Sequence, residues 1–305
     1  MRRQRARYAL GILVTALLWG IRPAGAGPAG PSLIVDAADL PALLVQFRPM
    51  ILAVESKLAS HPVGYLRGAV RVDEDQWTAD SRTQEQLDTL ATWARRIGRL
   101  GIDGRRMVVL YDGGDLKFAS RIRYLLAHYG VPRAVLVNGG WQALAPLVQR
   151  GALQGQPTAT LPGAQPFAPA VTQPPIPIAT RADVVKAVAQ RTALVIDVRS
   201  PQEYAGTRLL PPVTRGGHIP DAINLPLPEL FVPGRDSLLR GRSGLANAFR
   251  SRGIDPAKPI IVYCQDGARS SLAALALIEA GYSSVSLYYL SYADWQSDPM
   301  LPVVK

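Results

Sequence analysis

The sequence predicts two α/β domains in tandem, each a parallel β-sheet flanked by helices on both faces. First, its 305 residues are enough for two domains of ordinary size. Second, short apolar runs alternate with helical patterns, which is typical of parallel strands joined by helices. Third, the same series of predicted elements, strand, turn, helix and strand followed by a tryptophan, occurs once before and once after a proline-rich segment.

The composition is that of a globular protein. With 48% hydrophobic and 19% charged residues, the chain is not disordered as a whole. Its single cysteine, Cys264, excludes an internal disulfide and a metal site built from cysteines alone. The three histidines, His61, His128 and His218, are spread along the chain and leave little for a zinc site. We therefore expect no metal or other resident cofactor.

The N-terminus predicts a signal peptide at residues 1–26. Residues 9–21 form an apolar run too short for a membrane span of ~20 residues, and small residues lead up to Ala26. Four basic residues precede this run, Arg2, Arg3, Arg5 and Arg7. We expect cleavage after Ala26 and export, to the periplasm of a bacterium. An uncleaved anchor is the alternative, and the general and twin-arginine export routes both stay open.

The basic net charge is concentrated at the N-terminus. Cleavage lowers it from +11 to +6, because five arginines and no acidic residues lie within 1–26. The remaining basic residues are scattered among acidic ones. A mildly basic, solvated surface explains this pattern better than a nucleic-acid partner does.

The clearest boundary in the chain is residues 151–178. This segment is rich in proline and small residues and carries no charge, which is typical of an extended, semi-stiff linker. It predicts an N-terminal domain at 31–150 and a C-terminal domain at 179–305.

The two domains repeat one another element by element. Apolar, β-branched runs at Val108–Tyr111 and Ile260–Tyr263 predict buried strands, and a glycine-bearing turn follows each. Predicted helices come next at 119–128 and 268–280, then strands at 134–137 and 285–288, then Trp141 and Trp295. Upstream, Gly64 precedes Asp112 by 48 positions, and Gly217 precedes Cys264 by 47. Such similar spacing indicates an internal duplication.

Cys264 is the main candidate for a functional residue. It directly follows a predicted strand and precedes a predicted helix, at the edge of a parallel sheet where ligands bind. The turn can direct several backbone N–H groups at one point, and the helix adds partial positive charge, so a thiolate is favoured. A buried, inert cysteine is the alternative, and it is disfavoured by the position at a strand end. The turn comprises Cys264, Gln265, Asp266, Gly267, Ala268 and Arg269.

Arg269 falls in the first turn of the predicted helix. A cation is unfavourable there, because that end of a helix already carries partial positive charge. We interpret the placement as a sign that an anion occupies the loop. Removing Arg269 is then expected to weaken binding of an anionic substrate and to leave the folding stability little changed.

The turn at 264–269, CQDGAR, resembles the six-residue active-site loop of the rhodanese superfamily, sulfurtransferases that carry sulfur as a cysteine persulfide. Further motifs at 194–199, 217–224, 292–295 and 108–141 are similar to other parts of these proteins, so the resemblance covers nearly all of the predicted mature chain. It implies two tandem rhodanese-like domains, a persulfide on Cys264, and binding of substrate and persulfide by Gln265, Asp266, Gly267, Ala268 and Arg269. Tandem members are typically thiosulfate or 3-mercaptopyruvate sulfurtransferases.

Several positions depart from the pattern of the superfamily. The first repeat has Asp112 in place of the cysteine, which implies a non-catalytic domain that helps to wall the cleft. Glu203 stands where two-domain members usually carry arginine, and the pair Gln265-Asp266 matches neither donor class. Arg208 and Arg215 are candidates to attract the substrate. We favour thiosulfate, but the donor and the acceptor stay open.

Three other polar residues of the C-terminal half have both a functional and a structural interpretation. His218 is a conceivable general base, but a packed His-Ile-Pro turn is favoured. Asp197 and Arg199 are conceivable substrate contacts, but a charged pair at a strand end commonly orders the surrounding loops. We favour the structural role for all three.

Two rival functions fit less well. A cysteine phosphatase needs five residues between its cysteine and arginine, whereas four separate Cys264 from Arg269 and position 270 is Ser270. A non-catalytic sulfur carrier or protein-binding module stays open.

The expected partners are a small anionic sulfur donor and a thiol or cyanide acceptor, with no nucleic acid and no stable membrane insertion after signal cleavage. The oligomeric state stays open.

Overall fold

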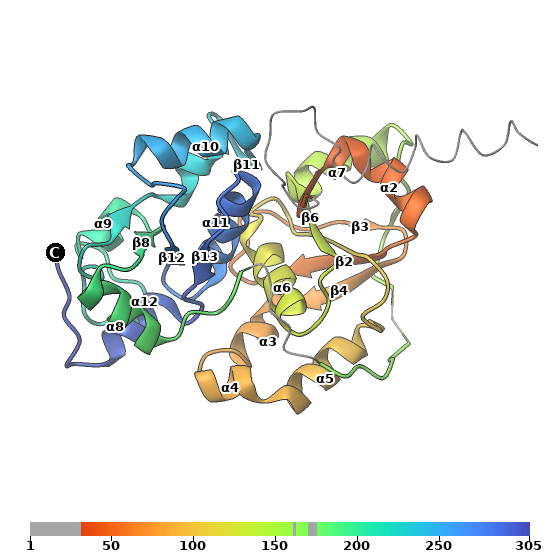
Figure 1. The fold of residues 1–305 in the computed structure, drawn as a ribbon. Helices are drawn as coiled ribbons and strands as arrows, with labels where there is room; N and C mark the ends of the chain where they lie inside the picture. The colour runs from red at the N-terminus through yellow and green to blue at the C-terminus, as the bar shows by residue number, and fades with distance from the viewer. Residues whose placement is uncertain (1–31, 161–162, 170–175) are drawn as a thin grey trace, which may run out of the picture.

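The structure is a computed structural model, and it describes residues 32–160, 163–169 and 176–305. The predicted signal peptide at 1–26 lies outside the described residues. Two α/β units lie side by side, each built around its own parallel sheet (Figure 1). Of the helices that the structure describes, none is both long and apolar enough to cross a membrane. The predicted fold class is confirmed.

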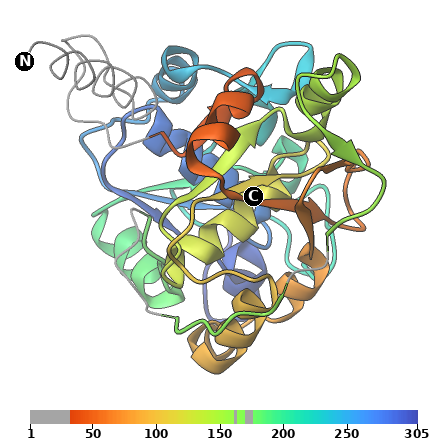
Figure 2. The same cartoon turned by 90° about the vertical axis from the view of Figure 1, so that its right-hand side faces the viewer.

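The N-terminal sheet is parallel throughout, with the strand order β1-β6-β5-β2-β4. Alternate side chains of β2 face opposite sides, so that Leu52 and Val54 join one core while Ile51 and Ala53 join another. In Figure 2, α2 and α7 lie above the sheet, and α4 and α5 lie below it. The strands are β1 (Ile34–Asp36), β2 (Met50–Glu55), β4 (Ala69–Asp73), β5 (Val108–Tyr111) and β6 (Ala134–Asn138), and the helices are η1 (Ala37–Asp39), α2 (Leu40–Phe47), α3 (Glu74–Ala79), α4 (Gln84–Asp88), α5 (Leu90–Arg99), α6 (Lys117–His128) and α7 (Gly140–Gln149).

The C-terminal sheet has the order β13-β12-β8-β9 and is also parallel. Residues Ile260 and Val262 of β12 face the core shared with α10 and α11, whereas Ile261 and Tyr263 face α8 and α12. Helices therefore cover both faces of this sheet as well. The elements are α8 (Arg181–Gln190), β8 (Leu194–Asp197), α9 (Pro201–Tyr204), β9 (Ile223–Asn224), η2 (Leu227–Leu230), β10 (Phe231–Val232), β11 (Arg235–Leu239), α10 (Arg242–Ser251), β12 (Ile260–Tyr263), α11 (Ala268–Glu279), β13 (Val285–Leu287) and α12 (Ser291–Ser297).

The predicted duplication is visible in the element boundaries. Strands β5 and β12 match the predicted runs, and α11 ends one residue before the predicted end. Helix α6 begins at Lys117, two residues before the predicted start, because Lys117 and Phe118 already have helical geometry after Leu116. The two helices are equivalent in the repeats and pack against each other between the sheets (Figure 1). One hydrophobic core therefore runs through α6 and α11 and joins the two units.

The predicted linker at 151–178 is tied to both units where the structure describes it. Strand β7 (Gly155–Gln156) pairs with β3 (Tyr65–Leu66), and the N–H of Gln165 donates to the carbonyl of Gly98 (2.9 Å). Ile178 forms a bridge with Leu287 of β13. The described part of the segment begins with a turn and has one short strand, β7. Backbone hydrogen bonds to neighbouring strands and loops hold this part of the segment in place, so it is not a freely moving linker there.

Candidate active site

The loop that carries Cys264 connects β12 to α11. Its backbone turns at Gly267, which caps α11 with a φ of +100°. A Cβ at this position would lie 2.6 Å from the carbonyl oxygen of Tyr289, so that both the left-handed conformation and the close approach require glycine. The local sequence therefore places Cys264 at the carboxyl end of the sheet and at the N-terminus of α11, as predicted.

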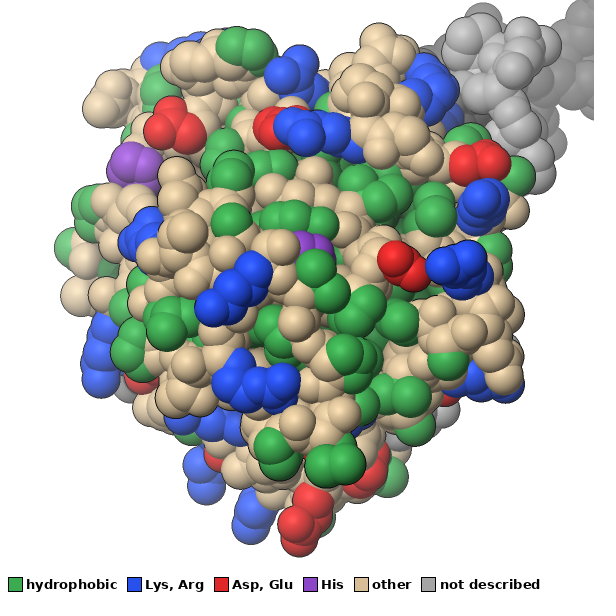
Figure 3. All heavy atoms as spheres, turned by 90° about the vertical axis from the view of Figure 1, so that its left-hand side faces the viewer, with side chains coloured by type: hydrophobic (Ala, Val, Ile, Leu, Met, Phe, Trp, Pro, Cys, Tyr) green, Lys and Arg blue, Asp and Glu red, His purple; other side chains and the backbone are tan. Residues whose placement is uncertain are grey.

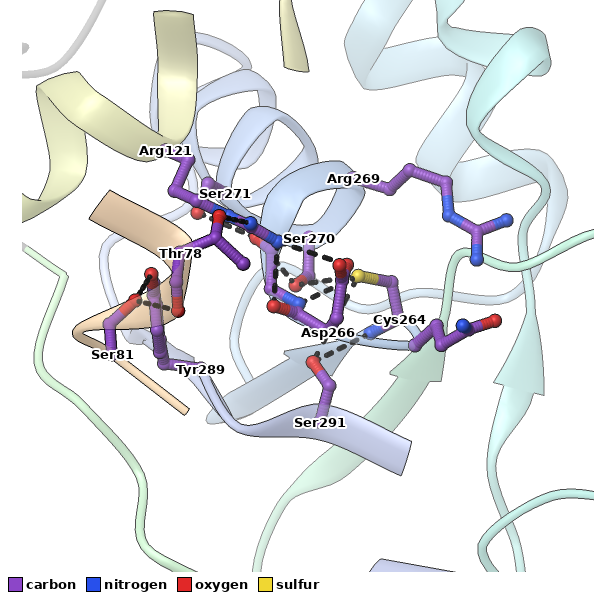
Figure 4. A network of polar contacts seen from close by, with 12 residues as sticks. Thr78, Ser81, Arg121, Cys264, Asp266, Arg269, Ser270, Ser271, Tyr289 and Ser291 are labelled. Carbon is purple, nitrogen blue, oxygen red and sulfur yellow. Dashed lines mark hydrogen bonds and ion pairs between the residues drawn. The ribbon is translucent and has the colours of Figure 1, made fainter. Parts of the chain in front are cut away.

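The sulfur of Cys264 is surrounded by hydrogen-bond donors (Figure 4). The residue is fully buried, and its Sγ accepts from the N–H of Gly267 (3.2 Å). Oγ of Ser270 lies 3.3 Å from the sulfur and 3.2 Å from the carbonyl oxygen of Gly267, and its one hydrogen can be donated to either. Oγ of Ser291 lies 3.9 Å from the sulfur and accepts from the N–H of Cys264 (3.2 Å). With the N-terminus of α11, these groups form an environment that stabilises a negatively charged sulfur.

Ser270 and Ser291 were not predicted as site residues. The sequence does hold a signal for Ser270, since it lies three residues after Gly267, in the first turn of the predicted helix. A hydroxyl at that spacing returns to the N-terminal end of a helix. Ser291 has no comparable signal, because it arrives from the segment between β13 and α12.

Arg269 is held by Glu203 and is directed away from the sulfur in Figure 4. Its two terminal nitrogens donate to the two carboxylate oxygens of Glu203 at 2.8 and 2.7 Å. Burial alone raises the pKa of Glu203, but the hydrogen bonds and charge of Arg269 outweigh it and lower the pKa to about 2. Glu203 thus supplies negative charge beside this cation at the start of α11, and the expected contact of Arg269 with a bound anion stays a prediction.

Asp266 is held in turn by an arginine of the N-terminal unit. Nη2 of Arg121, on α6, donates to the backbone carbonyl of Asp266 (2.7 Å) and lies 3.0 Å from its carboxylate. Burial raises the pKa of Asp266, but the nearby charge of Arg121 dominates and lowers it, so that the carboxylate is ionised. Arg121 was not predicted, and its contact with the loop joins residues 145 positions apart, which no local pattern reveals.

The loop that carries Cys264 forms part of the wall of a cleft between the two units. The cleft has a volume of about 1500 Å³. Gln265, Asp266 and Ala268 reach it, whereas the buried sulfur lies beneath its surface. Nε2 of Gln265 donates to the carbonyl of Pro211 (2.9 Å) on the rim. Exposed basic residues on opposite walls are Arg82 of the N-terminal unit and Lys186 of α8.

Arg208 and Arg215 do not line this cleft. Arg208 is exposed. The guanidinium of Arg215 donates to three backbone carbonyls, those of Gln296 (3.3 Å), Asp298 (2.7 Å) and Leu301 (2.8 Å). These carbonyls belong to the last turn of α12 and the segment after it, where a cation is favourable. Neither arginine therefore lines the cleft, and the expectation that they attract the substrate stays a prediction.

His218, Asp197 and Arg199, which we interpreted as structural residues, make packing and ion-pair contacts within the C-terminal unit. The ring of His218 stacks on Tyr204 with centroids 3.6 Å apart, and its Nδ1 lies 3.0 Å from the carbonyl of Tyr204. Asp197 and Arg199 form a buried ion pair at 2.6 Å, and Arg199 also donates to the carbonyl of Gly217 (2.7 Å). The pair orders the loop that leads to His218.

The equivalent loop of the N-terminal unit is filled by its own side chain. One carboxylate oxygen of Asp112 accepts from the N–H groups of Gly114 and Leu116 (2.9 Å each), and the other accepts from Ala119 (3.1 Å). Ser237 of β11 packs against Gly114, since a Cβ there would lie 2.9 Å from its Oγ. The first repeat thus retains a loop of converging backbone N–H groups that its own side chain fills and β11 covers.

The pairing of Arg269 with Glu203 predicts a pH-dependent loss of stability in Arg269→Met. Without its partner, Glu203 is a buried charge, and its pKa rises from about 2 towards or above the ordinary 4.5. At about 1.36 kcal/mol per pKa unit, this rise in the pKa of Glu203 lowers the free energy of unfolding by about 3 kcal/mol at pH 7. The lowered pKa of Glu203 stabilises the wild-type fold fully above about pH 4.5, and this stabilisation is lost as the pH falls to about 2. The difference in the free energy of unfolding between wild type and variant should therefore shrink over this range.

Urea denaturation between pH 7 and pH 2.5 measures this difference in the free energy of unfolding. Arg252→Met is the matched control, because Arg252 pairs with Glu229 on the exposed surface. An exposed pair contributes roughly 0–1 kcal/mol. An Arg269→Met variant as stable as the control variant at pH 7 would contradict the prediction.

Comparisons with known proteins agree with this geometry. Residues 180–298 match the family of rhodanese-like domains. A thiosulfate sulfurtransferase of Azotobacter vinelandii is 31% identical over 278 residues, which cover 89% of this chain and 96% of that protein. A 3-mercaptopyruvate sulfurtransferase of Escherichia coli (strain K12) is 31% identical over 245 residues, which cover 79% and 83% of the two chains.

A solved structure of similar architecture is that of SseA from Escherichia coli, described as a 3-mercaptopyruvate sulfotransferase with the rhodanese fold. It is 26% identical, with a TM-score of 0.67, and the match covers 86% of this chain and 99% of that one. Family, fold and the cysteine-bearing loop at a helix N-terminus therefore lead to one conclusion. The chain belongs to the rhodanese family and is a sulfurtransferase with two rhodanese-like units.

Proposed function

We propose that this sulfurtransferase moves sulfane sulfur from thiosulfate, or a related donor such as 3-mercaptopyruvate, to cyanide or a thiol through a persulfide on Cys264. The observation that carries the proposal is the buried Sγ of Cys264, with the N–H of Gly267 and the hydroxyl of Ser270 directed at it. These donors suit a sulfur that carries negative charge, as both the thiolate and the persulfide do.

The proposed reaction has two half-reactions. The Cys264 thiolate attacks the outer sulfur of thiosulfate, the sulfur–sulfur bond breaks, and sulfite leaves with the electron pair. With 3-mercaptopyruvate, a carbon–sulfur bond breaks and the released pyruvate enolate takes up a proton. Cyanide or a thiolate then attacks the terminal sulfur of the persulfide, and the Cys264 thiolate is restored. The cycle balances without a metal or redox cofactor, so we propose none.

The charge of the cleft supports thiosulfate as the first donor to test. Arg269, Arg121 and Arg199 are paired with carboxylates, so they offer little net charge to a dianion. Arg82 and Lys186 line the cleft and make no ion pair with the residues that the structure describes. Relatives named for thiosulfate and for 3-mercaptopyruvate are equally similar, so 3-mercaptopyruvate is the second donor.

We further propose export of the protein to a bacterial periplasm, on the basis of the N-terminal 26 residues. A single cysteine then cannot be lost to an internal disulfide in that oxidising compartment. No nucleic-acid partner is proposed. On the face of the C-terminal unit in Figure 3, the basic side chains are dispersed among acidic and neutral ones. Nucleic-acid binding usually requires a basic patch or stripe.

Replacement of the nucleophile tests the mechanism. Cys264→Ser should reduce thiocyanate formation from thiosulfate and cyanide to the uncatalysed rate, because a serine hydroxyl cannot form a persulfide. Intact-protein mass spectrometry after donor treatment should show one added sulfur atom in wild type and none in the variant. Circular dichroism serves as the folding control. Wild-type turnover in Cys264→Ser would overturn the mechanism, and no turnover in wild type would favour a non-catalytic module.

The N-terminal loop should not become a second sulfur carrier. In the double variant Asp112→Cys/Cys264→Ser, we expect no added sulfur, because Ser237 and the backbone of His61 pack against the glycines of that loop. Mass spectrometry after thiosulfate treatment measures the result, with wild type as the positive control. Sulfur uptake by the double variant would show that the N-terminal loop is accessible.

Processing of the N-terminus tests the proposed export. Expression of the full chain in a bacterium should yield a periplasmic protein that begins at Gly27, as determined by fractionation and N-terminal sequencing. Replacement of Ala24 and Ala26 by bulky residues should block cleavage. Full-length protein in the cytosolic fraction would contradict export.

A further inference from the structure

We propose that Arg121, from the N-terminal unit, is a positioning residue that orients the Asp266–Gly267 peptide so that its N–H donates to the sulfur of Cys264. This inference rests on the proposed function, in which that sulfur is the nucleophile and carries the persulfide.

The two ends of one peptide group carry the argument. Nη2 of Arg121 donates to the carbonyl of Asp266 (2.7 Å), and the N–H of Gly267, in the same peptide, donates to Sγ of Cys264 (3.2 Å). In a trans peptide, the C=O and N–H bonds point in opposite directions. The guanidinium and the sulfur therefore lie on opposite sides of the peptide. By fixing the carbonyl on one side, Arg121 fixes the N–H on the other (Figure 4).

The peptide needs such a partner because glycine follows it. Gly267 has a φ of +100°, and a residue without a side chain tolerates more than one peptide orientation. If the peptide rotated by half a turn, its N–H would face the guanidinium of Arg121 and its carbonyl would face the anionic sulfur. Both contacts would be repulsive. Arg121 thus favours the one orientation that stabilises the sulfur anion.

Arg121 is itself rigidly held within the N-terminal unit. Its side chain is buried, it pairs with Glu74 of α3 at 2.7 Å, and it donates to the hydroxyl of Thr78. Both contacts are made by Nη1, so Nη2 is left to bind Asp266. Burial lowers the pKa of Arg121, but the neighbouring acidic groups raise it overall, so the side chain stays charged. The N-terminal unit therefore contributes a cation to the catalytic loop as well as a wall to the cleft.

The role predicts a loss of catalysis that a loss of stability alone would not produce. Arg121→Met should lower kcat for thiosulfate by about 100-fold, the scale of losing one backbone-type donor to an anion, with KM changed less than about 3-fold. Arg121→Lys should recover part of kcat, since it retains the charge but not both contacts. Arg123→Met is the matched control, because Arg123 is also buried on α6 but donates to the carbonyl of Ala134 instead. It should lose stability and keep kcat.

Nuclear magnetic resonance supplies a test that needs no sulfur donor. Labelling with carbonyl-¹³C aspartate and ¹⁵N glycine selects the Asp–Gly pairs of the chain, at 103–104, 112–113 and 266–267. In wild type, the Gly267 amide resonance should shift when Cys264 is converted to its S-methylthio form, while that of Gly104 stays in place. In Arg121→Met, the Gly267 shift should be small; if that variant does not fold, Arg121→Lys carries both measurements.

The outcomes separate this inference from the proposed function. Wild-type kcat together with a wild-type Gly267 response in Arg121→Met would overturn the positioning role. A kcat loss as large in Arg123→Met would also overturn it, since the effect would then come from general instability. If wild type transfers no sulfur but the Gly267 response depends on Arg121, the proposed function fails and the positioning role stands.

Discussion

The need to surround the buried sulfur of Cys264 with hydrogen-bond donors is the constraint on which the rest of the structure depends. Removing an anion from water costs several kcal/mol unless hydrogen bonds and dipoles replace the lost solvation. The chain provides them where β12 meets α11, with the N–H of Gly267, the hydroxyl of Ser270 and the start of a helix around Cys264. The equivalent loop of the first repeat directs backbone N–H groups at the side chain of Asp112, which fills the loop. Burial raises the pKa of Asp112, and these hydrogen bonds offset part of that rise. Comparison of the two loops shows that the duplicated scaffold directs backbone N–H groups at one side chain, which is aspartate in the first repeat and cysteine in the second.

The charged residues around the loop act mainly on its shape. Glu203 holds Arg269, Arg121 holds Asp266, and Asp197 holds Arg199, each through a buried or half-buried ion pair. Breaking such a pair is costly, because the remaining charge is left without a partner. The surroundings of Cys264 are therefore rigid and close to neutral. The cations that can attract a substrate lie farther out, where Arg82 and Lys186 line the cleft.

Packing between the two units makes this arrangement possible. Helices α6 and α11 share one hydrophobic core, so α6 presents Arg121 to the loop in front of α11. In the reverse direction, β11 of the C-terminal unit hydrogen-bonds to Asn138 and lies against the loop of Asp112. Each unit thus contacts the equivalent loop of the other. The contact with the first loop covers it, whereas the contact with the second holds it beside an open cleft.

The sequence by itself determined the local structure and the place of Cys264 at the start of α11. These features depend on residues that are neighbours in the sequence: the buried strands, the turn after β12, the spacing of the repeats and the position of Cys264. The bounds of β5, β12 and α11 agree closely with the predicted ones. It did not determine which charges meet. Arg269 binds Glu203, 66 positions away, and Arg215 binds the end of α12. Arg121 reaches the loop of Cys264 from the N-terminal unit. None of these three contacts was predicted. Such contacts are decided by the packing of segments distant in sequence, because long, charged side chains reach partners that only the tertiary structure brings within hydrogen-bonding distance.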